Sequence, residues 1–295
     1  MLKFALKDAS LYLKLSKNSI LGKFICFRLD ALGSINDPII AAAIYTRHRV
    51  SGRITKETAP GRFQDLEAST LAILSGERPI LSGERPILHD VAVSSGITSV
   101  ELYHSVKKLG VEFQLFVSDK YSRYYSSGRF FCKIYGVDKE LIQAYCCNIL
   151  ADGKVSWNFP LSKILYQCLR KLDRPSKNLS VISLYDPKLL ELIKSEKVKE
   201  ITYDILTTKT PDHFTFVRCM NVLNQSYFTE DKILHALQLI KTSLRKGGVL
   251  LLGRTVGDGV NRATYYRKTE SGHLHPFQDI NGGSELKHIM SALIT

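Results

Sequence analysis

The sequence predicts an α/β fold built on a doubly wound, mainly parallel sheet. Two stretches carry this prediction. Residues 87–119 contain an apolar strand, a turn of small residues, a helix and an alternating strand that ends in an acid. Residues 179–255 then continue with apolar strands separated by helices. Strands joined through helices favour parallel pairing, because a parallel crossover needs a long connection and a helix supplies it.

Length and composition fit a globular protein with its own core. The chain has 295 residues, of which 44% are hydrophobic and 23% charged, enough for one large α/β domain with additions. We divide it into a mostly helical N-terminal cover, residues 1–74, and an α/β domain, residues 75–295, with an insertion at about 120–178. In the cover, Asp37-Pro38 predicts the start of a helix over 39–45, and residues 63–74 have apolar positions at helical spacing.

Charge points to anionic partners. Lys and Arg outnumber Asp and Glu by 41 to 28, which gives a formal net charge of +13 spread along the chain. This excess favours nucleic acid, acidic ligands or an anionic membrane surface, although many basic proteins bind none of these. No run approaches the ~20 apolar residues of a membrane span, so any membrane contact is expected to be peripheral.

The cysteines and histidines predict no metal site. The six cysteines form no CxxC pair and no metal-ligand spacing with the histidines. We therefore expect reduced thiols and a cytoplasmic location. The histidines are expected at the surface or in packing positions, not as ligands.

An identical tandem repeat, SGERPIL at 75–81 and again at 82–88, precedes the first strand of the α/β pattern. Each copy contains a glycine and a proline, so the two copies cannot form one smooth helix. Two copies are too few for a repeat architecture, and we interpret one of them as surplus surface loop.

The stretch ILHDVAVSSGIT, residues 87–98, is the centre of the predicted fold. A buried strand leads into the turn 92–96, and Thr98 with Glu101 predicts a capping box at the start of the next helix. Gly110 is expected to end that helix, and 111–118 alternates apolar and polar residues up to Asp119. This is a βαβ unit, with an acid 23 residues after Gly96, close to the ~20 at which an acid meets a ribose.

The remaining elements follow in order along the chain. We predict a hairpin from 130–135 and 141–147, a basic amphipathic helix over 161–172, a strand from 179 to Asp186 and a helix over 187–194. Strands at 198–204, 214–223 and 248–255, a helix at 229–244, a hairpin near 263–277 and a short final helix complete the pattern.

With these motifs placed, the chain resembles the class I S-adenosylmethionine-dependent methyltransferases over roughly 87–119 and 179–255. The strongest match is 214–255, FTFVRCMNVLNQSYFTEDKILHALQLIKTSLRKGGVLLLGRT. Its segment RCMNVLNQSYF is similar to the chemotaxis receptor methyltransferases, and LRKGG is similar to the family's turn, where a glycine pair ends a helix and reverses the chain. The resemblance implies a Rossmann-like, seven-stranded, mainly parallel sheet with helices on both faces.

The resemblance also implies S-adenosyl-L-methionine as the cofactor and assigns residues to it. Asp90 and the turn would hold its methionine end, Asp119 its ribose, Asp204 with Ile205 its adenine, and Asn221 would face the reacting sulfonium. The turn residues concerned are Ala92, Ser94, Ser95 and Gly96. No catalytic residue is assigned, because methyl transfer can proceed mainly by positioning the acceptor. For Arg218, in the same strand as Asn221, the alternative is a structural role without contact to the cofactor.

Several alternatives stay open. Ala92 and Ser94 stand where the family has glycines, and they are tolerable if the backbone there does not need a positive φ. Asp186 is a second candidate for the ribose acid. A binding or scaffold protein that has lost the cofactor is the alternative function, and a nicotinamide-dependent enzyme is disfavoured by the glycine pattern. The methyl acceptor and the oligomeric state do not follow from the sequence.

Overall fold

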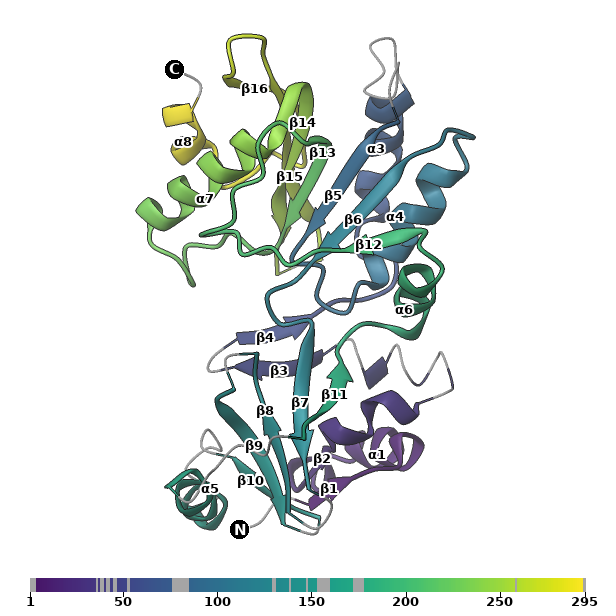
Figure 1. Cartoon of the computed structure of the whole chain (residues 1–295), viewed down its shortest axis with the longest axis vertical. Helices are drawn as coiled ribbons and strands as arrows, with labels where there is room; N and C mark the ends of the chain where they lie inside the picture. The colour runs from purple at the N-terminus through teal and green to yellow at the C-terminus, as the bar shows by residue number, and fades with distance from the viewer. Residues whose placement is uncertain are drawn as a thin grey trace. The chain divides into compact units, whose positions relative to one another are not determined.

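The computed structural model describes residues 4–35, 37, 40, 43–44, 47–51, 54–75, 85–128, 131–137, 139–146, 148–152, 160–171, 178–257 and 259–293. The chain forms two compact units (Figure 1). The first unit comprises residues 1–59 and 121–187, and the second comprises 60–120 and 188–295. The second unit is thus interrupted in sequence by a large part of the first.

The first unit is a mixed sheet with helices. Its seven strands follow the order β11-β7-β8-β9-β10-β1-β2. The strands are β1 (Phe4–Leu6), β2 (Ile25–Phe27), β7 (Arg123–Ser127), β8 (Phe131–Tyr135), β9 (Leu141–Cys146), β10 (Ile149–Asp152) and β11 (Ser180–Ser183). The helices are α1 (Ala9–Ser16), η1 (Leu21–Lys23), η2 (Leu29–Ser34) and α5 (Pro160–Lys171), and β3 (Arg47–Ser51) pairs with β4 (Ile54–Glu57) in a separate hairpin.

This unit corrects the predicted domain organisation. Residues 1–59 contain strands as well as helices, and they share one hydrophobic core with residues 121–184. Phe27 and Leu32 from the first segment pack there with Tyr124, Ile134 and Leu150 from the second. The hairpin β8–β9 and the helix α5 were predicted correctly. The hairpin belongs to a sheet that the N-terminal segment completes, and α5 contacts β9 and β10 of that sheet. Most of the tandem repeat and of the helix expected at 39–45 lies outside the described residues.

The second unit is the predicted doubly wound sheet. Its strand order is β12-β6-β5-β13-β14-β15-β16, in which β12 through β14 pair in parallel and β15 and β16 are antiparallel. The strands are β5 (Ile87–Val91), β6 (Gln114–Ser118), β12 (Val198–Glu200), β13 (Phe214–Met220), β14 (Leu244–Thr255), β15 (Asn261–Lys268) and β16 (Leu274–Ile280). The sheet is therefore mixed, with a parallel centre and an antiparallel hairpin at one end.

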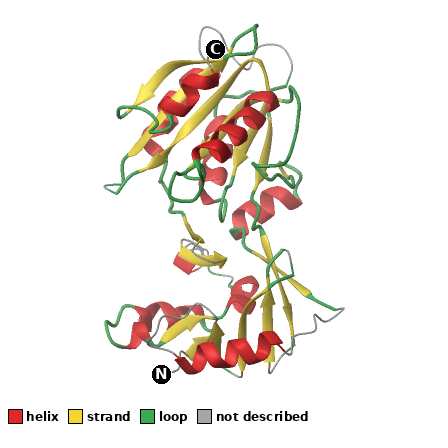
Figure 2. Ribbon diagram, turned by 90° about the vertical axis from the view of Figure 1, so that its left-hand side faces the viewer, coloured by secondary structure: helices red, strands yellow, loops and turns green. Residues whose placement is uncertain are grey.

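Helices flank the strands of this sheet (Figures 1 and 2). They are α3 (Gln64–Ser75), α4 (Ile97–Lys107), α6 (Pro187–Lys194), α7 (Glu230–Ser243), α8 (Lys287–Met290) and η3 (Ser291–Leu293). Every residue of β13 is buried, as expected for a central parallel strand covered on both faces. Side chains of β13 and β14 alternate between the two faces of the sheet. Arg218 and Leu251 therefore share one face, and Cys219 and Leu252 share the other.

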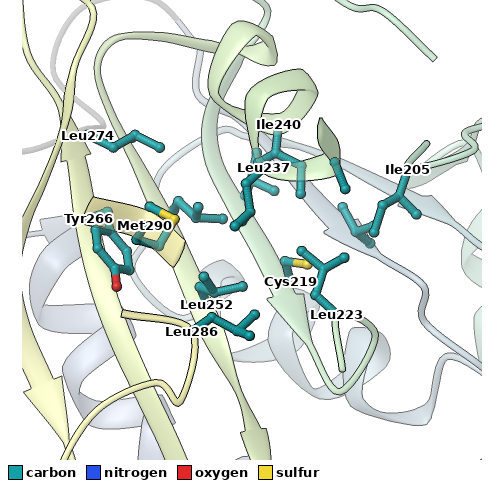
Figure 3. Close-up of a cluster of buried hydrophobic side chains, with 14 of the residues drawn as sticks. Ile205, Cys219, Leu223, Leu237, Ile240, Leu252, Tyr266, Leu274, Leu286 and Met290 are labelled. Carbon is teal, nitrogen blue, oxygen red and sulfur yellow. The ribbon is translucent and has the colours of Figure 1, made fainter. Parts of the chain in front are cut away.

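A large apolar cluster fills one face of this sheet. Cys219 and Leu252 from the central strands meet Leu237 and Ile240 of α7, and Tyr266 closes the cluster from β15 (Figure 3). Each of these side chains is almost completely buried. Burial of a large aliphatic side chain contributes about 1.5–3 kcal/mol, so this cluster holds α7 and the C-terminal segment on the sheet.

Some local predictions for this unit differ from the structure. The helix α4 is capped at Gly96, so Thr98 lies inside it, and Glu101 accepts a hydrogen bond from the backbone of Gly61 instead of closing a capping box. The Gly247-Gly248 pair does not end α7, which already ends at Ser243. The pair lies within β14, where the pairing of β14 with β13 is irregular. The strand predicted from 179 to Asp186 is β11, which pairs antiparallel with β7 in the first unit. That pairing partner is remote in sequence, and the local pattern did not identify it.

Candidate functional site

The candidate site lies at the carboxyl ends of the central strands of the second unit. From β5 the sheet extends to β6 and β12 on one side and to β13 and β14 on the other. The strand order therefore reverses between β5 and β13. Ligands of open α/β sheets bind outside the carboxyl ends of the strands at this reversal point. The turn after β5, Asp119 after β6 and Asn221 after β13 all lie at this edge.

The turn between β5 and α4 has an unusual backbone. Ala92, Ser94 and Gly96 have φ angles of 57°, 59° and 79°. All three lie in the left-handed region, which costs a residue with a side chain about 1–2 kcal/mol. The condition under which Ala92 and Ser94 would be tolerated without strain, a backbone that does not need a positive φ, is therefore not met: both residues adopt the left-handed conformation that glycine favours. Strain of this kind is held in place by surrounding structure and is concentrated at functional sites.

Gly96 is required by close packing as well as by its φ angle. A Cβ at this position would lie 2.0 Å from Cδ2 of Leu189, a fully buried side chain of α6. The turn is therefore clamped against a neighbouring helix. Beside it, the hydroxyls of Ser94 and Ser95 are buried and have no hydrogen-bond partner among the described residues. Two buried hydroxyls without partners are a cost that a polar ligand could remove.

Asp90 is buried and paired with Arg218 on one face of the sheet. Its carboxylate accepts hydrogen bonds from Arg218, with Nε–Oδ1 at 2.8 Å and Nη2–Oδ2 at 2.5 Å, and from the hydroxyl of Ser99 at 2.6 Å. Both partners of the ion pair are about 4% exposed. Arg218 also donates to the carbonyl of Thr98 at 3.0 Å, in the first turn of α4. This arrangement ties the strands β5 and β13 to the start of α4, so Asp90 supports the turn through its internal contacts.

Asp119 contacts the turn directly. Its Oδ2 accepts a hydrogen bond of 2.7 Å from the backbone N–H of Ser94. The structure therefore brings together the acid and the turn that the sequence predicted for one site. The alternative acid, Asp186, follows β11 and lies in the first unit. Asp186 is thus not at the end of a parallel strand of the doubly wound sheet.

Asp204 and Ile205 follow β12 in a turn. Asp204 caps this turn, because its Oδ1 accepts from the backbone N–H of Leu206 at 2.9 Å. Its Oδ2 lies 3.3 Å from Nζ of Lys120, the residue after Asp119. Ile205 belongs to the large apolar cluster and is 9% exposed (Figure 3). Asp204 is thus connected to the carboxyl edge, whereas the side chain of Ile205 contributes mainly to the core.

Asn221 uses its side chain to join two strand ends. Its amide oxygen accepts from the backbone N–H of Thr255 at 2.7 Å, and its amide nitrogen lies 3.2 Å from the hydroxyl of the same residue. The φ angle of Asn221 is 63°, a conformation that asparagine adopts more readily than most residues. The predicted position at the edge is correct, and the side chain is engaged within the protein.

A polar network that sequence analysis missed continues from Thr255. The hydroxyl of Thr255 donates to Asn261 at 2.8 Å, and Nε of Arg62 donates to this hydroxyl at 3.0 Å. Asn261 in turn donates to Asp65 at 2.6 Å, at the start of α3. These residues come from two segments far apart in the sequence: Arg62 and Thr255 are separated by 193 positions. No local pattern could reveal their proximity.

His89 is a packing residue. Its ring is 1% exposed and lies against Phe214 and Tyr203, with ring centroids 4.5 Å and 4.8 Å away. Burial lowers the pKa of His89 to about 3, so the ring is neutral at physiological pH. Its Nε2 lies 2.9 Å from the hydroxyl of Ser118. In the described part of the chain, no cluster of His, Cys, Asp and Glu side chains could hold a metal ion.

Among the helices in the described ranges, none combines the length and apolarity needed to cross a bilayer.

Comparison with known proteins gives structural matches only. No family model matches the sequence, and no curated protein matches it. The solved structures that the chain resembles include the DszA carbon methyltransferase, with 14% identity, a TM-score of 0.35 and coverage of 65% of this chain and 34% of that one. The CMeT domain of the citrinin polyketide synthase has 12% identity, a TM-score of 0.37 and coverage of 83% and 47%.

A third match is the Burkholderia thailandensis 1,6-didemethyltoxoflavin-N1-methyltransferase, solved with S-adenosylhomocysteine, with 10% identity, a TM-score of 0.32 and coverage of 84% and 87%. The chain thus spans about a third and about half of the first two matched chains. These values describe likeness, and the fold is established by the strand order above. In its sequence motifs and in its structural matches, the chain is similar to S-adenosylmethionine-dependent methyltransferases.

Proposed function

We propose that the chain is an S-adenosylmethionine-dependent methyltransferase with an acceptor still to be identified. The observation that carries this proposal is the β5–α4 turn. Three alternate residues, Ala92, Ser94 and Gly96, have left-handed backbones at the reversal point of a doubly wound sheet, and Asp119 contacts the middle one. A protein that only needed a strand-to-helix connection would gain nothing from a strained backbone at the two positions without glycine.

The chemistry of these residues suits the proposed cofactor. The buried hydroxyls of Ser94 and Ser95 lack partners among the described residues and can bind a carboxylate or an amine. Asp119 and Asp204 supply acceptor oxygens for ribose hydroxyls and an adenine amine. When bound, the cofactor supplies an electrophilic methyl group. The chain would then hold the cofactor, keep the turn rigid through the Asp90–Arg218 pair and position an acceptor beside it.

The acceptor is proposed to be anionic, because the formal net charge of the chain is +13. A nucleic acid, an acidic protein and a lipid-linked metabolite all meet this description. Retention on a nucleic-acid column compared with binding to anionic vesicles, each measured at increasing salt concentration, separates a nucleic-acid acceptor from a membrane-bound one.

Calorimetric titration with S-adenosylhomocysteine and S-adenosylmethionine tests the proposed cofactor. Asp119→Ala is expected to weaken binding at least about tenfold, which corresponds to about 1.4 kcal/mol, since it removes both an acceptor oxygen and the contact with Ser94. Asp231→Ala is the matched control, because Asp231 is an exposed acid on α7. Absence of binding of both ligands to the folded wild-type protein would refute the proposal.

The alternative function is a binding or scaffold protein that keeps the fold without the cofactor. Specific contacts favour it: the side chains of Asp90 and Asn221 are hydrogen-bonded within the protein, and Leu189 packs against Gly96. The same titration separates the two functions. A scaffold protein would bind neither ligand, and Ser94→Gly with Ala92→Gly would not restore binding.

A further inference from the structure

A cavity of about 350 Å³ lies between α3 and α4 in the second unit. Its volume is at the lower end of the range for small-molecule sites, about 300–1,000 Å³. The apolar part of its lining includes Phe63, Leu66, Leu71 and Leu251. None of the residues assigned above to the cofactor, all of which the structure describes, lines this cavity. The cavity is therefore separate from the carboxyl-edge site.

Arg218 gives this cavity a hydrogen-bond donor on a buried residue. The side chain lines the cavity and is 5% exposed. Its Nε and Nη2 donate to Asp90, and Nη2 also donates to the carbonyl of Thr98. Within the described part of the chain, no residue accepts a hydrogen bond from Nη1. A guanidinium cannot lose its proton in a protein, so Nη1 remains a donor that a ligand oxygen can satisfy.

Two carboxylates line the same cavity, one from each helix. Glu67 of α3 accepts a hydrogen bond from the hydroxyl of Ser105, and one oxygen of Glu101 of α4 accepts from the backbone N–H of Gly61 at 2.7 Å. These contacts fix both carboxylates in place. Each contact uses one oxygen, so a second oxygen on each glutamate is left to accept from a ligand.

The charges around the cavity are balanced. The charged side chains that line the cavity are Arg218, Lys108 and Lys188 on the positive side and Glu67 and Glu101 on the negative side. Asp90 lies outside the lining and neutralises Arg218 through their ion pair. A ligand with a net charge would leave one charge uncompensated in a partly buried site, which is unfavourable. A ligand with one group of each sign keeps the balance.

We propose that this cavity binds a small zwitterion with an apolar side chain, of the class of the apolar α-amino acids. The carboxylate of the ligand accepts from Nη1 of Arg218, and its ammonium group donates to Glu67 and Glu101. The apolar group packs among Leu66, Leu71 and the other apolar side chains of the lining. This site shares no lining residue with the proposed cofactor site, and the two are connected through the Asp90–Arg218 pair.

Three probes dissect the recognition on the wild-type protein. L-Leucine carries both charged groups, isocaproate lacks the amine, and isoamylamine lacks the carboxylate. Ligand-observed NMR and equilibrium dialysis are expected to show binding of L-leucine, with both of the other probes weaker by at least about tenfold. Binding of isocaproate or isoamylamine as tight as that of L-leucine would overturn the zwitterion assignment, and absence of L-leucine binding would overturn the site.

Variants place the binding in this cavity. Leu71→Trp fills the space and is expected to abolish L-leucine binding, whereas Glu67→Gln combined with Glu101→Gln is expected to weaken it at least about tenfold. Glu270→Gln is the matched control, since Glu270 is 86% exposed in its side chain and does not line the cavity. L-Leucine binding that is unaffected by Leu71→Trp would refute this location. Titration of S-adenosylhomocysteine against the same variants reports on the cofactor site separately, because these variants leave Asp119 and the turn intact.

Discussion

Replacing Ser94 by glycine is expected to stabilise the second unit, although glycine substitutions usually destabilise proteins. Ser94 has a φ angle of 59°, and release of this strain contributes about 1–2 kcal/mol. Loss of its buried, unpartnered hydroxyl adds about 1–3 kcal/mol. The greater freedom of glycine in the unfolded chain opposes these gains by about 0.5–1 kcal/mol.

Ser95→Gly is the matched control for this prediction. Ser95 is also buried with an unpartnered hydroxyl, but it is not among the residues with a positive φ. The hydroxyl and entropy contributions therefore cancel between the two variants. Ser94→Gly is expected to be more stable than Ser95→Gly by about 1–2 kcal/mol, the strain contribution alone.

Urea denaturation followed by far-UV circular dichroism measures both free energies of unfolding by linear extrapolation. The comparison uses the same transition in each variant, because two compact units need not unfold together. Equal stability of the two variants would refute the conclusion that the turn stores backbone strain at Ser94.

Three further predictions concern the same region. Arg218→Met leaves Asp90 buried without its partner and is expected to lower the free energy of unfolding by about 3–5 kcal/mol. Adding Asp90→Leu should recover much of this loss. Urea denaturation of both single variants and the double variant tests this, and additive losses would contradict the pairing. Gly96→Ala is expected to cost about 2–5 kcal/mol from backbone strain and overpacking together. Leu189→Ala should be less destabilising in that background than in the wild type, and equal losses in the two backgrounds would exclude the clash. For His89, the pKa falls from 6.5 in the unfolded chain to about 3 in the folded one, so the unfolded state binds the proton first and stability is lost as the pH falls below 6.5. The expected loss is about 1.4 kcal/mol per pH unit, and His89→Leu should abolish this part of the dependence; an unchanged pH profile would contradict it.

Local pattern was sufficient for most elements of the second unit. The fully buried, mostly apolar strand β13 and the helix α7 lie close to their predicted positions, because the pattern of apolar residues is set by the geometry of each element. The association of Asp119 with the turn was also predictable, since an acid at the end of a neighbouring parallel strand must lie near the turn after β5.

The division into units was not predictable in the same way. The strand β11 has the local pattern of a parallel strand, yet it pairs with β7 in the first unit. Strand pairing depends on which partner is available, and the core that joins residues 1–59 to 121–187 is formed by contacts remote in sequence. Local periodicity contains no information about that choice of partner.

The sequence by itself therefore determined the βαβ unit around residues 87–119, the position of its turn and the acid that meets it. Only the tertiary structure decided the backbone conformation of that turn and the use of its side chains. Ala92 and Ser94 are held at positive φ angles by contacts around the turn. The Asp90–Arg218 pair holds the strand before it, Asp119 binds the backbone of Ser94, and Leu189 packs against Gly96 at its end. A single residue's preference would avoid this conformation, and the surrounding contacts together outweigh it.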